Sequence, residues 1–143
     1  MRVLIRPATR ADVQKVYDFI CDLENQVFDF EVFKNIFFEN IQLPDRHYLI
    51  AHNDEQILGY ASMHAQLLLH HCGKVGEIEE MYVLPTQRNL GIGQQFLTEF
   101  VAIATRDKYV LLEVTSNKKR LDTHRFYQKN GFVHTHAKFV KEF

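Results

Sequence analysis

The sequence lacks several features that would place it outside the ordinary intracellular globular class. It has only two cysteines, Cys21 and Cys72, in 143 residues, which are too few for a disulfide framework. No stretch approaches the roughly 18 consecutive apolar residues of a membrane span, and the N-terminus shows no signal-peptide pattern. We therefore expect a cytoplasmic protein with reduced thiols and no membrane partner.

An excess of charge of either sign is also missing. The 17 basic residues nearly match the 18 acidic ones, for a net charge of −1. Such a balance gives no general attraction to nucleic acid, so we expect no nucleic-acid partner, and any basic site must be local. Apolar residues are abundant, at 46% with twelve phenylalanines, and this composition argues against disorder. The length fits one domain, residues 1–143.

Apolar periodicity predicts the order strand, two helices, three strands, helix, strand, helix and closing strands. Thr9 followed by Asp12 resembles a capping box ahead of the first helix, and Gly131 suits the position after the last helix. The predicted segments are strand 2–7, helices 13–23 and 30–41, strands 47–51, 56–65 and 75–84, helix 92–104, strand 109–114, covered on both faces, helix 121–129, and one or two strands within 132–143. This order predicts an α/β (α+β) domain with a mixed central sheet of six to seven strands and about four helices.

The best local signal is the segment Arg88-Asn89-Leu90-Gly91-Ile92-Gly93, between a predicted strand and a predicted helix. Two close glycines let a ligand approach the backbone, and the first amides of a helix have no helical partner. With the helix dipole this favours binding of a diphosphate, although the glycines would also serve simply to cap a helix. The preceding strand carries Glu77, Glu79 and Glu80, and a β-bulge near Glu79 and Glu80 would turn one carboxylate into a cleft.

These segments, in this order and spacing, resemble the GNAT acetyltransferase superfamily over the whole chain. The matching residues are Arg88-x-x-Gly91-x-Gly93 for the acetyl-CoA loop, Glu77-Ile78-x-x-Met81-Tyr82-Val83-x-Pro85 for the preceding strand, Ser116-Asn117 with Phe126-Tyr127-x-x-x-Gly131-Phe132 for the C-terminal motif, and the opening Ile5-Arg6-Pro7-Ala8-Thr9-x-x-Asp12. Asn89 stands where the family often has glycine, and asparagine tolerates left-handed backbone geometry better than most residues.

The resemblance implies a single-domain GNAT fold and an acetyl-CoA-dependent N-acetyltransferase that acts on a primary amine by direct attack in a ternary complex. It implies that Glu77 is the base, directly or through a water, and that Tyr127 protonates the leaving thiolate. The implied acetyl-CoA contacts are the backbones of Met81, Tyr82 and Val83, the amides of Arg88, Asn89, Leu90, Gly91, Ile92 and Gly93, and Asn117. Glu79 or Glu80 is an alternative base, packing on the sheet is an alternative role for Tyr127, and an acyl-cysteine route through Cys72 is an alternative mechanism.

Within the superfamily the chain resembles bacterial aminoalkylphosphonate N-acetyltransferases. The residues concerned are Val16-Tyr17, Ile20-Cys21-Asp22-Leu23, Phe28-Asp29, Leu69-His70-His71, Gly76-Glu77-Ile78 and the stretch from Thr115 to Tyr127. Independently, Lys118, Lys119 and Arg120 lie at a predicted helix N-terminus, where each positive charge is unfavourable by roughly 0.3–1 kcal/mol, and this indicates a bound anion. We place Arg120, Lys119 and Asp29 at the substrate; the phosphates of CoA, or a solvated basic turn, are alternative explanations.

Further alternatives concern a metal, the acceptor and the oligomer. His70 and His71 are candidate ligands of a divalent metal that bridges phosphonate and amine, although surface or packing roles would explain them equally. The acceptor could instead be a polyamine, an aminoglycoside or a protein amine, or the chain could be a non-catalytic acetyl-CoA-binding module. The phenylalanine-rich second helix and the late strands offer a surface for a homodimer.

Overall fold

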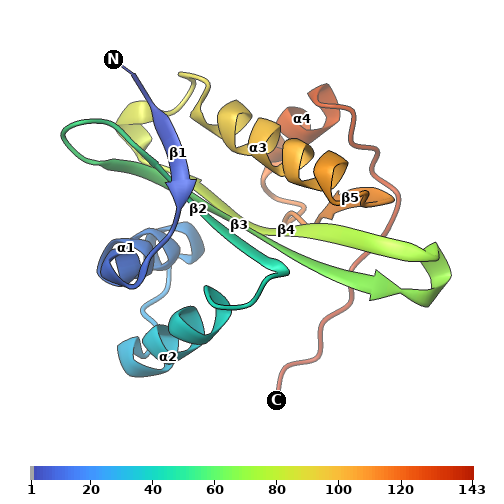
Figure 1. The fold of residues 1–143 in the computed structure, drawn as a ribbon, viewed down its shortest axis with the longest axis horizontal. Helices are drawn as coiled ribbons and strands as arrows, with labels where there is room; N and C mark the ends of the chain where they lie inside the picture. The colour runs from blue at the N-terminus through green and yellow to red at the C-terminus, as the bar shows by residue number, and fades with distance from the viewer. Residues whose placement is uncertain (1) are drawn as a thin grey trace.

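The computed structural model describes residues 2–143 as a twisted sheet with helices on both faces (Figure 1). Its elements are β1 (Leu4–Pro7), α1 (Val13–Glu24), α2 (Phe30–Asn40), β2 (Arg46–His52), β3 (Ile57–Leu68), β4 (Gly73–Val83), α3 (Ile92–Arg106), β5 (Leu111–Val114) and α4 (Leu121–Lys129). Short 3₁₀ turns lie at Arg10–Asp12, Leu69–His71 and Pro85–Gln87. The predicted order and the four predicted helices are confirmed as far as α4.

The five strands lie in their order along the chain, β1-β2-β3-β4-β5. Neighbouring strands are antiparallel from β1 to β4, and β4 and β5 are parallel, so the sheet is mixed as expected. Helices α1 and α2 lie below the sheet in Figure 1, while α3 and α4 lie above it. Parallel pairing requires a crossover connection, and α3 supplies it between β4 and β5.

Each face of the sheet has its own hydrophobic cluster. On the α3 face, Phe96 and Phe100 are fully buried against Leu58, Met63 and Ile78. On the α1 and α2 face the cluster is more aromatic, and it consists of Val16, Phe19, Ile20, Phe37, Ile50, Tyr60 and Tyr82. Successive residues of one strand belong to different clusters, because successive side chains of a strand point to opposite faces of the sheet.

Local polar contacts fix where the helices begin and end. The Asp12 carboxylate accepts two hydrogen bonds of 2.8 Å from the Arg6 guanidinium and one of 2.7 Å from the Thr9 amide, which ties β1 to the start of α1. Asp29 caps α2 by accepting from the Val32 amide at 3.0 Å. Gly131 follows α4 with φ of 88°, the left-handed geometry expected at that position.

The prediction of closing strands within 132–143 is wrong. The sheet described for residues 2–143 has five strands rather than the predicted six to seven. Residues 133–143 have no regular structure and are exposed, with Val133, Phe139 and Val140 at 78%, 93% and 70%. Their alternating pattern covers no sheet face, so the pattern alone does not make a strand. The four residues of β5 are only half-buried because β5 forms the edge of this sheet.

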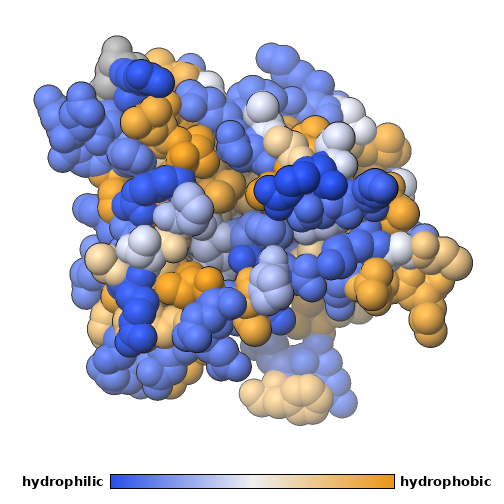
Figure 2. Space-filling model, viewed as in Figure 1, coloured by the Kyte–Doolittle hydropathy of each residue, from blue (hydrophilic) through white to orange (hydrophobic). Residues whose placement is uncertain are grey.

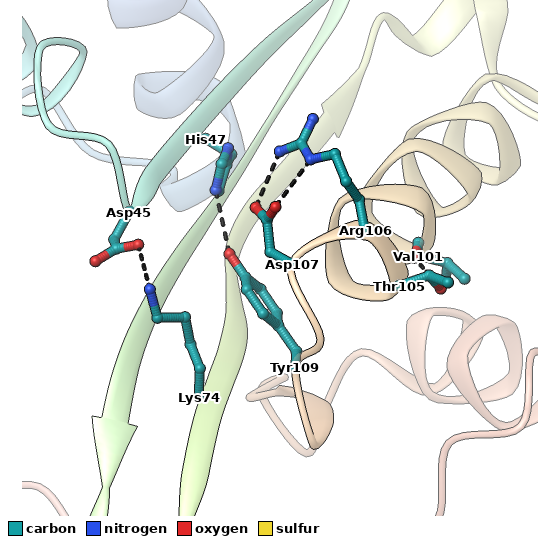
Figure 3. Close-up of polar contacts among 8 residues, drawn as sticks. All are labelled: Asp45, His47, Lys74, Val101, Thr105, Arg106, Asp107 and Tyr109. Carbon is teal, nitrogen blue, oxygen red and sulfur yellow. Dashed lines mark hydrogen bonds and ion pairs between the residues drawn. The ribbon is translucent and has the colours of Figure 1, made fainter.

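Polar contacts link the start of β2, the start of β4 and the turn after α3 (Figure 3). Lys74 and Asp45 form an ion pair at 2.8 Å, and His47 Nε2 lies 3.2 Å from the Tyr109 hydroxyl. Arg106 donates two hydrogen bonds of 2.9 Å to Asp107. The His47–Tyr109 contact joins the α3–β5 connection to the sheet at the end remote from the β4–α3 loop.

The surface in view is largely hydrophilic (Figure 2). Apolar side chains gather at its right-hand end, where Figure 1 places the tip of the β3–β4 hairpin and where Leu67 and Leu69 are 77% and 97% exposed. Within residues 2–143 no helix has the length and apolar character that crossing a bilayer requires.

Candidate active site

A β-bulge interrupts β4 at Glu79, as the sequence predicts. Ser62 of β3 pairs with Glu80, whereas the next residue, Met63, pairs with Ile78, so Glu79 has no partner in the register. The extra residue resets the alternation of side chains. Ile78 belongs to the α3-face cluster, and Glu80 contacts Ser62 on the opposite face.

Strand β4 separates from β5 at the same point. The parallel pairing ends with Ile78 opposite Val114, so the edge of β4 from Glu79 to Val83 has no β5 partner. A cleft of about 880 Å³ lies there, between β4, the N-terminus of α3, the β5–α4 loop and α4. A free strand edge can pair with an extended ligand through main-chain hydrogen bonds.

The structure brings most of the predicted site residues together in this cleft. Those that line it are Glu77, Met81, Val83, Arg88, Asn89, Gly91, Ile92, Gly93, Asn117, Arg120 and Tyr127. The side chains of Tyr82, Leu90, Lys119, Asp29, His70 and His71 are not among its lining residues within 2–143. Tyr82 instead stacks on Phe19 with ring centroids 4.8 Å apart.

The N-terminus of α3 offers unpaired main-chain amides. Asn89 and Gly91 adopt left-handed geometry, with φ of 64° and 87°, and this turns the loop into the helix. The first helical hydrogen bond runs from the Gln95 amide to the Gly91 carbonyl at 3.0 Å, so the amides of residues 92–94 have no acceptor within the helix. No side chain in residues 2–143 caps this end.

Gly93 marks where a ligand can approach this loop closely. A Cβ atom built on Gly93 would lie 3.6 Å from Met81 Sδ and from the Phe126 ring, which are ordinary contacts. Protein packing therefore does not require glycine there. Arg88 has a structural role, because its Nε donates to the Val83 carbonyl at 2.8 Å and its guanidinium lies 5.4 Å from the centre of the Tyr82 ring.

Carboxylates gather on the β4 side of the cleft. Loss of hydration, followed by hydrogen bonding with Glu77 and the charges of Glu77 and Glu80, raises the pKa of Glu79 to about 8. Burial also raises the pKa of Glu80, and the hydroxyl of fully buried Ser62 donates a hydrogen bond that partly offsets this. At pH 7 Glu79 is therefore mainly protonated, and Glu77 is its hydrogen-bonding partner.

Tyr127 lies on the opposite side of the cleft. It is 6% exposed and packs edge-on against Phe126 and Phe132, with ring centroids 5.1 and 5.3 Å away. Burial raises the pKa of its hydroxyl to about 12. The hydroxyl is consequently protonated at neutral pH and able to donate a proton or a hydrogen bond.

The β5–α4 loop contributes a second polar group of residues. Arg120 Nη2 donates to the Leu23 carbonyl at 3.0 Å, which joins the start of α4 to the end of α1. The Asn117 side-chain oxygen accepts from the Lys119 amide at 2.9 Å, so Asn117 shapes the loop. Gln87 Oε1 and Ser116 Oγ line the cleft and are buried without a hydrogen-bond partner in the described chain.

Several residues line the cleft that the sequence patterns did not assign to it, among them Leu23, Glu24, Gln87, Lys138 and Val140. Leu23 and Glu24 come from the end of α1, and Lys138 and Val140 come from the C-terminal segment. No local pattern marks them, because their place in the cleft depends on contacts between segments far apart in the sequence.

The two candidate metal ligands lie away from the cleft. His70 and His71 belong to the Leu69–His71 turn at the tip of the β3–β4 hairpin, with ring centroids 4.2 Å apart. Across residues 2–143, no three histidine, cysteine, aspartate or glutamate side chains are grouped to hold a metal ion. The structure therefore does not place these imidazoles where they would bridge a substrate beside Glu77.

Three comparisons with known proteins agree. Residues 44–134 match a family model described as an acetyltransferase (GNAT) domain. The chain is 37% identical over 137 residues to the aminoalkylphosphonate N-acetyltransferase of Salmonella typhimurium, covering 96% of this chain and 89% of that protein. A transcriptional regulator from Bacillus halodurans has the same fold, with a TM-score of 0.91, 23% identity, and coverage of 99% and 100%. Glucosamine-6-phosphate N-acetyltransferase from Arabidopsis thaliana does too, with a TM-score of 0.83, 19% identity, and coverage of 100% and 99%.

Proposed function

This chain belongs to the GNAT acetyltransferase family, and on that premise we propose that it transfers the acetyl group of acetyl-CoA to the primary amine of a small aminoalkylphosphonate. The observation that carries the proposal is the single cleft in which Glu77, Tyr127 and the open N-terminus of α3 meet. The Salmonella relative, named for this substrate class, supports the choice of acceptor.

The cleft suits the co-substrate of this family in three respects. The unpaired amides of residues 92–94 would hold a diphosphate, which the helix dipole also favours. Gly93 leaves the space that a side chain would otherwise occupy, and the free edge of β4 from Met81 to Val83 would pair with the extended pantetheine arm. Bound acetyl-CoA would supply a thioester whose acetyl carbon accepts a nucleophile.

In the proposed mechanism a residue on the β4 side of the cleft accepts a proton and a residue on the α4 side donates one. An alkylammonium must lose a proton before its nitrogen can attack. Glu77, the hydrogen-bonding partner of Glu79, accepts that proton directly or through a water. Glu79, protonated at neutral pH, donates a hydrogen bond within the pair. The Tyr127 hydroxyl, whose pKa is about 12, donates a proton to the departing thiolate.

Arg120 is the proposed contact for the phosphonate. It lines the cleft at the start of α4, and only one of its five N–H donors is engaged by the Leu23 carbonyl bond. Guanidinium groups match phosphonate oxygens in charge and in fork geometry. Lys119 and Asp29 remain candidates, but Lys119 does not line the cleft, and the Asp29 carboxylate is engaged in capping α2.

The first test measures release of the CoA thiol from acetyl-CoA with a panel of amines. The panel contains 2-aminoethylphosphonate, its phosphonate-free counterpart ethanolamine, spermidine, an aminoglycoside and a lysine peptide, each with and without a chelator. We expect turnover of 2-aminoethylphosphonate to exceed that of ethanolamine by at least tenfold, or about 1.4 kcal/mol. Equal turnover of the two would contradict the proposed acceptor but not the acetyl transfer.

A polyamine is the second candidate acceptor, and one observation favours it. Five acidic residues line the cleft: Glu24, Glu77, Glu79, Glu80 and Asp122. Acidic clefts attract polycations. Preference for spermidine in the panel would select this alternative, whereas acetyl-CoA binding without turnover of any amine would indicate a non-catalytic binding module.

Substitutions of Glu77 and Glu79 distinguish which of the two carboxylates is the base. We expect Glu77→Gln to lower kcat by about 10²–10⁴, the usual contribution of a general base, and Tyr127→Phe to lower it by a similar factor. Glu79→Gln keeps a hydrogen-bonding group and should cost less. Glu99→Gln, on the exposed side of α3, is the matched control. A larger loss for Glu79→Gln than for Glu77→Gln would reassign the base to Glu79.

Arg120→Gln tests the phosphonate contact. We expect a rise in KM for 2-aminoethylphosphonate with little change for ethanolamine, because only the first substrate carries the anion. Equal losses on both substrates would assign Arg120 to holding α4 against α1 through Leu23 rather than to the substrate.

A further inference from the structure

The C-terminal segment, residues 133–143, combines exposure with a place in the active-site cleft. Within residues 2–143 it belongs to no helix or strand, and every one of its residues is exposed. In Figure 1 it leaves α4 above the sheet, passes β5 and ends below the sheet. Lys138 and Val140 nevertheless line the same cleft as Glu77, Met81 and Tyr127. The segment therefore contributes a residue with a primary amine, Lys138, to the cleft that holds the proposed catalytic groups.

The charge of Lys138 acts on the carboxylate pair. Its ammonium group favours the ionised form of Glu79 and so offsets part of the rise in the pKa of that residue. Among the lysines of the segment only Lys138 lines the cleft; Lys141 does not, and its ammonium lies 5.9 Å from the centre of the Phe143 ring. The two lysines are both exposed and differ in their access to the catalytic groups.

We propose that Lys138 is a self-acetylation site, modified by the active site of its own chain. The inference rests on the proposed acetyl transfer and extends it to an acceptor tethered to the enzyme. Lys138 Nζ carries the same functional group as a small amine substrate. Because it is held on the same chain, its effective concentration at the cleft is set by the segment and not by diffusion.

The reaction balances as an ordinary acyl transfer. The Lys138 ammonium loses one proton to Glu77, and its nitrogen then forms an amide bond with the acetyl carbon as the carbon–sulfur bond of the thioester breaks. Tyr127 protonates the departing sulfur, and the second proton, lost from nitrogen as the amide forms, restores the Tyr127 hydroxyl. The products are an Nε-acetyl-lysine and the free thiol of CoA, with net release of the one proton that came from the ammonium.

Acetylation would remove the positive charge of Lys138 from the cleft. The ionised form of Glu79 would lose that stabilisation, so the pKa of Glu79 would rise further. Modified protein should therefore show an amine-acetylation pH profile displaced toward higher pH. Because Lys138 lines the same cleft and would react with the same acetyl group, acceptor and Lys138 should compete.

The test incubates the full chain with isotopically labelled acetyl-CoA and no acceptor, and follows each lysine by peptide mass spectrometry. We expect Lys138 to gain the label at least about tenfold faster than Lys141, as intramolecular positioning allows. The first-order rate constant should not change when the protein is diluted. Added 2-aminoethylphosphonate should slow labelling of Lys138 and leave Lys141 unaffected.

Two variants distinguish enzymatic from chemical acetylation. Tyr127→Phe and Glu77→Gln should each abolish the excess labelling of Lys138 and leave the background at Lys141. Equal labelling of both lysines, insensitive to either variant, would overturn the proposal. A rate constant that rises in proportion to protein concentration would overturn modification within one chain.

The inference and the proposed function can fail separately. Wild-type protein that turns over 2-aminoethylphosphonate but shows no excess labelling of Lys138 refutes only the self-acetylation. Protein that binds acetyl-CoA but acetylates neither small amines nor Lys138 refutes both.

Discussion

The two faces of the sheet are built differently. The α3 face is closed by apolar side chains, with Phe96 and Phe100 fully buried among aliphatic neighbours. The α1 and α2 face carries a chain of hydrogen bonds: Arg46 donates to Asn40 at 2.9 Å, Asn40 donates to the Tyr48 hydroxyl at 2.7 Å, and that hydroxyl lies 2.9 Å from His64 Nε2.

The difference determines how each face responds to pH. Apolar packing does not depend on protonation, whereas burial on the second face lowers the pKa of His64 and raises the pKa of Glu80. His64 pairs with Glu77 across β3 and β4, so the polar chain reaches the carboxylates of the cleft. The stability that the α3 face contributes should therefore not vary with pH. The stability that the α1 and α2 face contributes should depend on the protonation of groups that lie beside Glu77, the proposed base.

The largest expected effect comes from the apolar face. Phe96→Ala removes a side chain that is 0% exposed and should lower the free energy of unfolding by about 3–5 kcal/mol. The loss should be the same at pH 6 and pH 8, measured by urea unfolding. Val101→Ala on the same helix, where Val101 is 47% exposed, should change stability by about 0.5 kcal/mol or less. A strongly pH-dependent loss for Phe96→Ala would contradict the comparison.

A smaller but pH-dependent effect is expected on the other face. Ser62→Ala removes the hydroxyl that donates to Glu80 and should cost about 1–3 kcal/mol at pH 8, because a buried carboxylate loses its donor. The substitution raises the pKa of Glu80 further, so folded protein binds its proton more tightly. The cost should therefore decrease as the pH is lowered toward 5. A cost independent of pH would mean that Glu80 is not the affected group.

Tyr48→Phe should have a more modest effect. It removes the hydroxyl between Asn40 and His64, at about 0.5–1.5 kcal/mol for each hydrogen bond lost. Tyr17→Phe is a matched control, since its hydroxyl donates to the Phe28 carbonyl at 2.6 Å and does not join two segments through a histidine. Thermal unfolding should show the larger loss for Tyr48→Phe, and the reverse order would contradict a continuous polar chain.

The smallest expected effect is the pH dependence due to Glu79. Its pKa is raised to about 8 in the folded chain, so folded protein binds more protons than unfolded protein between about pH 4.5 and 8. Stability should consequently fall as the pH rises through this range. Because Glu79 is exposed, solvent screening limits the effect to about 1 kcal/mol, or about 2–4 °C in Tm.

Glu79→Gln should flatten that dependence. The best window is pH 6.5 to 8, because burial lowers the pKa of His47 and His64 and their contribution is then lost only as the pH falls below about 6.5. Glu99→Gln serves as control. An unchanged slope for Glu79→Gln would contradict the raised pKa.

Sequence patterns predicted the features that depend on neighbours along the chain. Helix α4 has the predicted limits, Leu121–Lys129, because its apolar spacing and the glycine after it act locally. A bulge near Glu79 was predicted because strict alternation would put Glu77 and Glu79 on one face with apolar Met81 and Val83. Asn89, which stands where the family often has glycine, adopts the left-handed geometry that asparagine tolerates better than most residues.

Features that depend on distant contacts were not predictable in the same way. Residues 132–143 have a strand-like pattern, but a strand also needs a partner edge, and the pattern does not show whether one is available. Lys138 and Glu24 line the cleft because the C-terminal segment and the end of α1 both approach it, and no local signal records that approach. Arg120 was identified by its unfavourable charge, whereas its contact with Leu23, 97 positions away, was not foreseen.

The single extra residue in β4 also determines which genetic changes the cleft can tolerate. Replacing one codon at Glu77, Glu79 or Glu80 alters one side chain and leaves the pairing of β3 and β4 intact. Deleting the codon of Glu79 would restore simple alternation, so the residues on one side of the deletion would change faces relative to those on the other. Among descendants of this sequence that keep their activity, length changes within β4 should therefore be rarer than substitutions.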